Sequence, residues 1–261
     1  MSSLPLRRDT VPGASFVATR SYDDALVMAT ETLHCYGSML VTGPTGVGKT
    51  VTCRQVMADL ARDYQVPGVW VQLGSNPTPK EVVSQLLLAL GMRPQRGEPT
   101  WVLARELGDL LATEPRVVWV DEAHHLRTNA FTTIRTIHDR PDARWMLGLV
   151  GTERLTKRLK TDQPEILSRT GRHVHMHRIE DRTELLDTLA AWHPLLATCP
   201  PERLVRMNRV GPRGQFRKWE QLLATLIRLT EVSGDLSEQV EALALRQCGY
   251  TLPAELTRWL S

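Results

Sequence analysis

The chain has 261 residues, of which 42% are hydrophobic and 23% are charged, and its formal net charge is +3. This composition is typical of a globular protein with one large or two small domains, and no apolar run approaches the roughly 20 residues of a membrane-spanning helix. The four cysteines lack the paired spacing of a zinc knuckle or a disulfide framework. The first residues, "MSSLPLRRDTVPG", lack the apolar centre of a secretory signal, so we expect a cytoplasmic protein without a membrane partner.

Short apolar runs alternate with helical patterns over the first two thirds of the chain, which predicts an α/β fold with a parallel sheet sandwiched by helices. The predicted strands are "SMLVTG", "VWVQLG", "RVVWVDE", "WMLGLVGT" and "RHVHM", and the helices cover about 49–63, 79–91, 99–113, 128–138 and 152–160. After about residue 180 only amphipathic helical patterns follow, with a break at "VGPRG". We therefore expect an N-terminal arm (1–20), an α/β domain (21–178) and a small all-α domain (179–261).

The segment "GPTGVGKT", residues 43–50, follows the first predicted strand and opens a helix. Its glycines permit a tight backbone path whose N–H groups bind the β-phosphate of a nucleotide. Lys49 would neutralise the β- and γ-phosphates, and the Thr50 hydroxyl would bind Mg²⁺. ATP and Mg²⁺ are thus the predicted cofactors, and the loop residues expected to hold the nucleotide are Gly43, Pro44, Thr45, Gly46, Val47, Gly48, Lys49, Thr50 and Val51.

A second motif, "RVVWVDEAHHL", delivers two carboxylates to the end of a hydrophobic strand, where ligands bind in open α/β sheets. We expect Asp121 to orient Mg²⁺ and Glu122 to polarise the attacking water. "DEAH" also occurs in helicases, but about 80 helical residues after the sheet domain cannot build the second motor lobe that such a helicase needs. His124 and His125 are predicted as helix-start or interface residues.

Three further segments carry polar side chains that suit a nucleotide site. Thr152 ends the strand "WMLGLVGT", where it either bonds the attacking water or the γ-phosphate or caps the following helix. Arg169 and Arg172 in "ILSRTGRHV" are placed to reach the nucleotide of a neighbouring subunit, the alternative being ordinary surface arginines. Arg213 and Arg217 in "VGPRGQFRKW" are predicted to contact the nucleotide from the helical domain.

The stretch "HVHMH" places His173, His175 and His177 on one face of a strand. This spacing can hold a metal ion, but no nearby carboxylate or cysteine completes a site in the sequence. We therefore interpret these histidines as a partly exposed or interfacial strand face.

This ordered set of motifs resembles the AAA+ ATPases, and more narrowly the transposition regulators related to the phage Mu B protein, TniB and TnsC. The resemblance covers about residues 20–230 and rests on "GPTGVGKT", "VVWVDEAHHL", "GLVGTERL", "EILSRTGR" and "VGPRGQF". It implies an AAA+ parallel sheet followed by a helical lid. Gln215 stands where a sensor 2 arginine is expected, so Arg213 and Arg217 remain alternatives for that role. The other implied roles are Lys49 and Thr50 as Walker A, Asp121 and Glu122 as Walker B, Thr152 as sensor 1 and Arg169 as a finger acting in trans.

In such assemblies DNA lies along the inner surface and contacts loops that follow the second strand. The matching stretches here are "NPTPKEVV" and "LGMRPQRGEPT", which offer Lys80, Arg93, Arg96 and Thr100 to phosphates without a base-reading pattern.

The resemblance therefore implies a regulator of transposition that assembles on double-stranded DNA with ATP as a homo-oligomeric ring or helical filament. Its further implied partners are a transposase and a target-selection protein. Two alternatives stay open: a signalling or secretion-associated ATPase that binds protein partners and no DNA, and a helper ATPase of insertion-sequence transposases.

Overall fold

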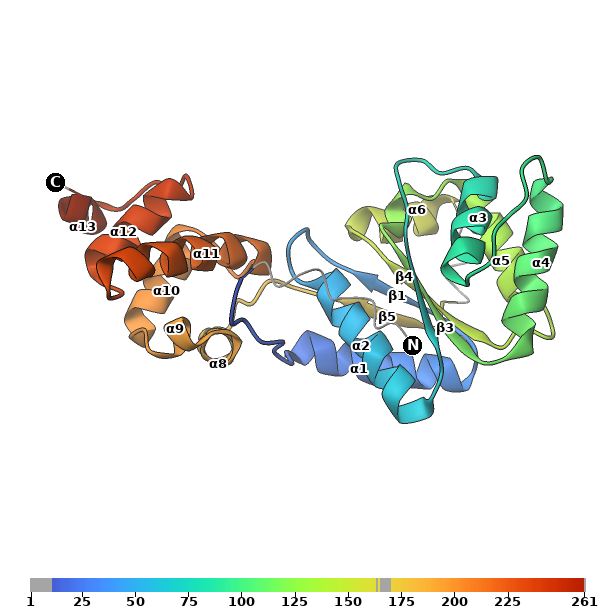
Figure 1. Ribbon diagram of the computed structural model, residues 1–261, viewed down its shortest axis with the longest axis horizontal. Coiled ribbons are helices and arrows are strands. Elements are labelled where there is room, and N and C mark those ends of the chain that lie inside the picture. Colours follow the sequence, from blue (N-terminus) through green and yellow to red (C-terminus); the bar gives the residue numbers. More distant parts are fainter. Residues whose placement is uncertain (1–10, 163, 165–169, 261) are drawn as a thin grey trace. The chain divides into compact units, whose positions relative to one another are not determined.

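The computed structural model describes residues 11–162, 164 and 170–260 of the chain (Figure 1). These residues divide into an α/β unit, residues 20–45 and 49–176, and a helical unit, residues 11–19, 46–48 and 177–260. Each unit has its own cluster of buried hydrophobic side chains. In the part of the chain described, no helix combines the length and the apolar character that crossing a membrane requires.

A five-stranded parallel sheet forms the centre of the α/β unit, in the order β2-β3-β4-β1-β5. Almost every residue of the three inner strands is buried, as expected for continuous apolar runs in a sheet covered on both faces. The predicted parallel sheet is confirmed. The last residue of each strand lies one or two positions before the end of the apolar run that predicted it. The strands are β1 (Ser38–Thr42), β2 (Gly68–Gln72), β3 (Arg116–Asp121), β4 (Trp145–Val150) and β5 (Arg172–His175).

Helices cover both faces of this sheet (Figure 1). One face is covered by α1 (Arg20–His34) and α2 (Lys49–Tyr64), which pack against each other. The opposite face buries a large apolar cluster under a second helical layer. That layer contains α3 (Pro79–Ala89), α4 (Thr100–Thr113), α5 (Thr128–His138) and α6 (Glu153–Asp162), and the short 3-10 turn η1 (Ala123–His125) follows β3.

The sequence-based prediction missed α1. Its buried positions Ala25, Ala29 and Leu33 follow helical spacing, so the signal was present. It was weak because two of these three side chains are alanine, which supplies little hydrophobic contrast. The helix packs on α2 and on β5, and it completes the cover of that face.

The helical unit contains the remaining helices in the described part of the chain. Trp219 lies in its core, and Asn208 Oδ1 accepts hydrogen bonds from Trp219 Nε1 at 3.0 Å and from the Gly214 N–H at 2.8 Å. This amide therefore ties the turn between two helices to the core. The elements are α8 (Arg182–Trp192), α9 (Pro194–Ala197), α10 (Pro201–Val210), α11 (Phe216–Ser233), α12 (Glu238–Gln247), α13 (Ala254–Thr257) and η2 (Arg258–Leu260).

Residues 11–19, predicted as part of a polar arm, pack on the helical unit. Val11 is buried in the core of that unit, and the Ser15 N–H donates to the Trp192 carbonyl at 2.9 Å. His193 Nε2 lies 3.0 Å from the Pro12 carbonyl. This segment thus contributes to a hydrophobic core whose other residues lie more than 160 positions later in the sequence.

Candidate nucleotide site

Neighbouring strands place the predicted site residues along one edge of the sheet. In a parallel sheet the carboxyl ends of all strands meet at the same edge. The loop of residues 43–50 leaves β1 there, Asp121 ends β3, and Thr152 follows β4, which lies between those two strands. The topology therefore gathers three motifs that are far apart in the sequence.

The loop after β1 has the backbone that its glycines predicted. Gly43 adopts φ 150°, and a Cβ at this position would collide with the carbonyl oxygen of Met176. Gly46 and Gly48 also have positive φ angles, 83° and 96°, which other residues rarely adopt. Lys49 Nζ folds back over the loop and donates to the carbonyl oxygens of Gly43 and Pro44 at 2.9 and 2.7 Å. The ammonium group is thus held over the concave side of the loop.

A direct hydrogen bond joins the two predicted metal ligands. Thr50 Oγ1 donates to Asp121 Oδ2 at 2.9 Å, across 71 positions of sequence. Asp121 is 3% exposed, and its burial raises the pKa of its carboxyl, while the hydrogen bonds from Thr50 and from the Glu122 N–H lower it. A buried carboxylate beside a hydroxyl is the set of hard oxygen donors that Mg²⁺ prefers, so these residues fit the predicted ion.

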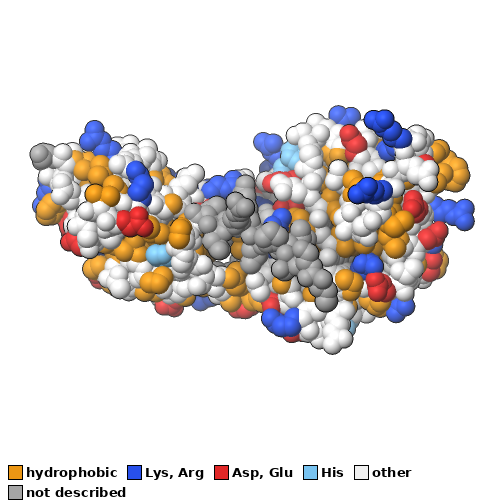
Figure 2. Space-filling model, viewed as in Figure 1, with side chains coloured by type: hydrophobic (Ala, Val, Ile, Leu, Met, Phe, Trp, Pro, Cys, Tyr) orange, Lys and Arg blue, Asp and Glu red, His pale blue; other side chains and the backbone are white. Residues whose placement is uncertain are grey.

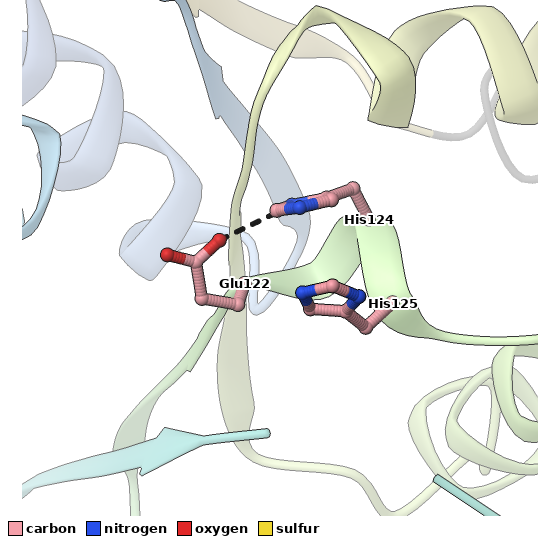
Figure 3. Close-up of side chains that lie close together, drawn as sticks. All are labelled: Glu122, His124 and His125. Carbon is pink, nitrogen blue, oxygen red and sulfur yellow. Dashed lines mark ion pairs between the residues drawn. The ribbon is translucent and has the colours of Figure 1, made fainter. Parts of the chain in front are cut away.

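Glu122 has a left-handed backbone, with φ 55° and ψ 32°. Such a conformation is costly for a residue with a side chain, and it is frequent at functional sites. It turns the carboxylate toward His124, whose Nδ1 lies 3.3 Å from Glu122 Oε2 (Figure 3). Sequence analysis did not predict this pair, because the pair depends on a left-handed backbone conformation, which glycine, asparagine or aspartate would indicate but glutamate does not.

The hydroxyl of Thr152 is buried, and it has no hydrogen-bond partner among the described atoms. Its carbonyl oxygen accepts from the Leu155 N–H at 2.9 Å, at the start of α6. Two roles were expected for this side chain, a contact with the nucleotide or water and a helix cap. The cap hydrogen bond is not seen, because no backbone N–H donates to Thr152 Oγ1 in the described structure. A buried hydroxyl without a partner costs free energy, which favours a ligand or water that completes it.

Of the predicted arginines, Arg217 contacts the phosphate loop through its backbone, because its N–H donates to the Gly46 carbonyl at 3.1 Å. Arg213 has φ 50° in the turn before α11, and its role stays a prediction. Arg172 starts β5 and pairs with Glu31 at 3.0 Å. Arg169 lies outside the described residues, so its role stays a prediction.

The predicted DNA-contacting residues lie on the helical layer beside β2. A capping box between Thr78 and Glu81 starts α3 and exposes Lys80 in its first turn. Arg93 and Arg96 are exposed in the loop that leaves the other end of α3, about 16 Å away for an 11-residue helix. Thr100 is the first residue of α4. Figure 2 shows basic and acidic side chains interspersed over the visible face of the α/β unit, without a single basic field.

The prediction from the sequence did not include an open polar cleft of about 680 Å³ at the start of α5. Two arginines from different elements, Arg127 and Arg158, line it. The Arg158 guanidinium also donates to the His124 carbonyl at 3.1 Å, which links the cleft to the turn after β3. The other lining residues are Asn76, Thr128, Asn129 and Thr132.

Comparison with known proteins supports this description of the fold. Residues 34–159 match the family model described as an AAA domain. This segment contains the loop of residues 43–50, β3 and β4. A search of curated protein sequences found no match.

Solved structures that resemble this chain include ORC2 of Aeropyrum pernix with ADPNP and ADP (17% identity, TM-score 0.75, 98% of this chain and 75% of that chain). A second is Cdc6p of Pyrobaculum aerophilum (15% identity, TM-score 0.77, 95% of this chain and 73% of that chain). A third is Drosophila ORC bound to DNA (15% identity, TM-score 0.66, 94% of this chain and 65% of that chain). The chain therefore has the α/β fold of AAA+ ATPases, and identities this low speak for the fold alone.

Proposed function

We propose that this chain is an ATPase that binds double-stranded DNA in an ATP-dependent manner. The hydrogen bond between Thr50 and Asp121 carries the proposal, because it joins the phosphate loop to the acidic strand end in one site. Lys49 adds a cation above the same loop. A loop that binds a nucleotide without hydrolysing it would not need the adjacent Glu122, which supplies a base beside the Mg²⁺ ligands.

In this proposal the chain's own groups perform binding, orientation and proton transfer. Backbone N–H groups of the loop and Lys49 Nζ bind the β- and γ-phosphates, with phosphate oxygens replacing the Gly43 and Pro44 carbonyls around the ammonium. Thr50 and Asp121 would hold Mg²⁺, which neutralises the charge that develops on the phosphate oxygens. Glu122 accepts a proton from the attacking water, and the Thr152 hydroxyl gains a partner in that water or in the γ-phosphate.

The proposed DNA contacts are those of Lys80, Arg93, Arg96 and Thr100. Lys80 is exposed in the first turn of α3, and Arg93 and Arg96 are exposed in the loop between α3 and α4. They can reach phosphates but form no array that could read base edges. Binding of DNA by a protein of this fold is supported by the structure of Drosophila ORC bound to DNA.

The finer part of the proposal is that the protein assembles into a homo-oligomer on target DNA and regulates a transposase. It rests on the resemblance of the motifs to transposition regulators and on the predicted trans finger Arg169. Hydrolysis would then end the DNA-bound state. A transposase reading frame beside the gene, together with ATP-dependent retention of that transposase on DNA coated with this protein, would support this part.

The test of the main proposal measures ATP hydrolysis and duplex binding by the full chain. We expect turnover with Mg²⁺ and ATP, tight binding to unrelated duplexes with a non-hydrolysable analogue, and weaker binding with ADP. Lys49→Ala should lose both nucleotide binding and the nucleotide effect on DNA. Hydrolysis without any ATP-dependent DNA binding at low salt would favour the ATPase that acts on protein partners.

A further inference from the structure

The turn that follows β3 gathers three side chains that can ligate a metal. Glu122, His124 and His125 each offer one ligand atom, and these atoms lie within 4.8 Å of one another. All three come from one segment of four residues (Figure 3). Among the residues that the structure describes, this is the set of histidine, cysteine and acidic side chains whose geometry suits an ion.

The distance between the ligand atoms of Glu122 and His124 fits a small ion of the zinc type. Ligand atoms at about 2.1 Å from a tetrahedral Zn²⁺ lie about 3.4 Å apart. The Glu122 Oε2 to His124 Nδ1 distance, 3.3 Å, already has this value. The rings of His124 and His125 have centroids 4.3 Å apart, and neither side chain is fully buried. A modest rotation of these side chains can therefore bring the three ligand atoms to the spacing of a tetrahedral site. Two imidazoles and one carboxylate leave a fourth position for water.

The backbone that carries these ligands is already ordered. The side chain of Ala123 is fully buried, and the His125 N–H donates to the Glu122 carbonyl at 2.9 Å. The Arg158 guanidinium fixes the His124 carbonyl from α6. A site on a fixed turn loses little conformational entropy when it binds an ion.

The state of His124 also favours ligation. Its Nδ1 is buried and makes no hydrogen bond in the described structure, although Glu122 lies beside it. A buried nitrogen without a partner is a group that a metal ion can satisfy.

We propose that Glu122, His124 and His125 bind a borderline transition-metal ion such as Zn²⁺, and that the bound ion inhibits ATP hydrolysis. The inhibitory part rests on the proposed function, because it requires Glu122 to be the base that activates water. A carboxylate that ligates Zn²⁺ is a weaker base, because the ion withdraws its electron density, so it accepts a proton from the attacking water less readily. This site is distinct from that of Mg²⁺, which prefers the hard oxygens of Thr50 and Asp121.

The first test measures binding directly, with untagged full-length protein and Co²⁺ as a spectroscopic probe. We expect one equivalent of Co²⁺ to give a visible absorption band that Zn²⁺ abolishes. His125→Ala and His124→Gln should each weaken binding by at least about tenfold, whereas His34→Ala, which removes an exposed histidine of α1, should not. Unchanged binding in both site variants, or no binding by the wild type, would overturn the proposal. Loss of binding in His173→Ala would instead assign the ion to β5 and equally overturn it.

The second test measures hydrolysis in excess Mg²⁺ with added Zn²⁺, each variant being compared with its own rate without Zn²⁺. Wild-type protein should be inhibited, and a chelator that spares Mg²⁺ should reverse the effect. His125→Ala should need at least about tenfold more Zn²⁺. Equal inhibition of both proteins would mean that Zn²⁺ acts through ATP, which contradicts the inhibitory role. If the protein hydrolyses no ATP, the proposed function fails, while the Co²⁺ titration still decides whether the metal site exists.

Discussion

Glu122 is the residue whose chemical role can be separated most cleanly from its structural role. Glu122→Gln keeps the size of the side chain and the left-handed backbone but removes the base. We expect ATP binding to persist and turnover to fall about 10²- to 10⁴-fold. Equilibrium binding of a fluorescent ATP analogue and steady-state phosphate release measure the two effects. Wild-type turnover in Glu122→Gln would reject this residue as the base.

Thr152 offers a second test at the scale of one side chain. Because its buried hydroxyl lacks a partner in the described structure, Thr152→Val should leave the melting temperature unchanged or raise it slightly, since no hydrogen bond is lost. Turnover should nevertheless fall about tenfold or more if the hydroxyl bonds the attacking water or the γ-phosphate. Thr152→Ser, which retains the hydroxyl, is the matched control. A drop in stability with normal turnover would restore the interpretation as a helix cap.

The sequence could predict these site residues only in part. The loop of residues 43–50 and the pair Asp121–Glu122 were predicted because each motif follows a predicted strand. Such motifs in that position have few functions other than nucleotide binding. The position of the Glu122 carboxylate beside His124 and the unpartnered hydroxyl of Thr152 depend on a backbone angle and on burial. Neither leaves a pattern in a single sequence.

Strands β3 and β4 pack so closely at one position of β4 that no residue larger than glycine fits there. Gly148 pairs in register with Trp119, and a Cβ on Gly148 would overlap the indole ring. Trp119 is fully buried and stacks on Trp70, so it cannot move aside freely. Gly148→Ala should therefore lower the free energy of unfolding by about 1–3 kcal/mol in denaturant titrations.

Gly74→Ala is the matched control for this prediction. No atom lies within 4 Å of where its Cβ would be, so its effect should be close to zero. If the two variants were equally stable, the indole ring would have to be more mobile than its contacts indicate.

The packing of α1 on α2 includes a hydrogen bond from Tyr22 to Asp59 at 2.7 Å. Burial, and then this hydrogen bond, raise the pKa of Tyr22 from 10.0 to about 12. Between these pH values the unfolded chain loses this proton and the folded protein keeps it, so the stability that Tyr22 contributes is lost as pH rises through this window. Tyr22→Phe should show a shallower loss of stability from pH 10 to about 12.

Tyrosinate absorbance checks the same prediction in the folded state. The chain has four tyrosines, so the difference between the titrations of wild type and Tyr22→Phe isolates Tyr22. A midpoint near pH 10 in that difference would contradict the proposed shift.

The prediction of elements succeeded where apolar runs were long or helical spacing was strong, as in β3 and α5. It failed for α1, whose inner face depends mainly on alanine. It also assigned residues 11–19 to a polar arm, because a single buried valine, Val11, cannot be told from an exposed one without its distant core partners.

At the scale of the whole molecule, the net charge of +3 does not favour strong binding to DNA by a broad basic field, and the face shown in Figure 2 carries mixed charge. Affinity would have to come from a few phosphate contacts in each protomer, added together over an oligomer. The number of such contacts can be measured, because each neutralised phosphate releases counterions and lowers the slope of log affinity against log salt by about 0.9.

Arg93→Ala combined with Arg96→Ala should therefore make this negative slope shallower by about 1.8 for each protomer if both guanidinium groups contact phosphates. The loss of affinity should be similar for unrelated duplexes, since neither residue reads bases. Arg105→Ala combined with Arg144→Ala is the matched control, because it removes two exposed arginines of the same unit and the same amount of charge. Both variants must bind ATP as the wild type does. An equal change of slope in the two double variants would mean that overall charge, rather than the loop between α3 and α4, governs binding. The arginines of the polar cleft, Arg127 and Arg158, would then be the next phosphate contacts to test.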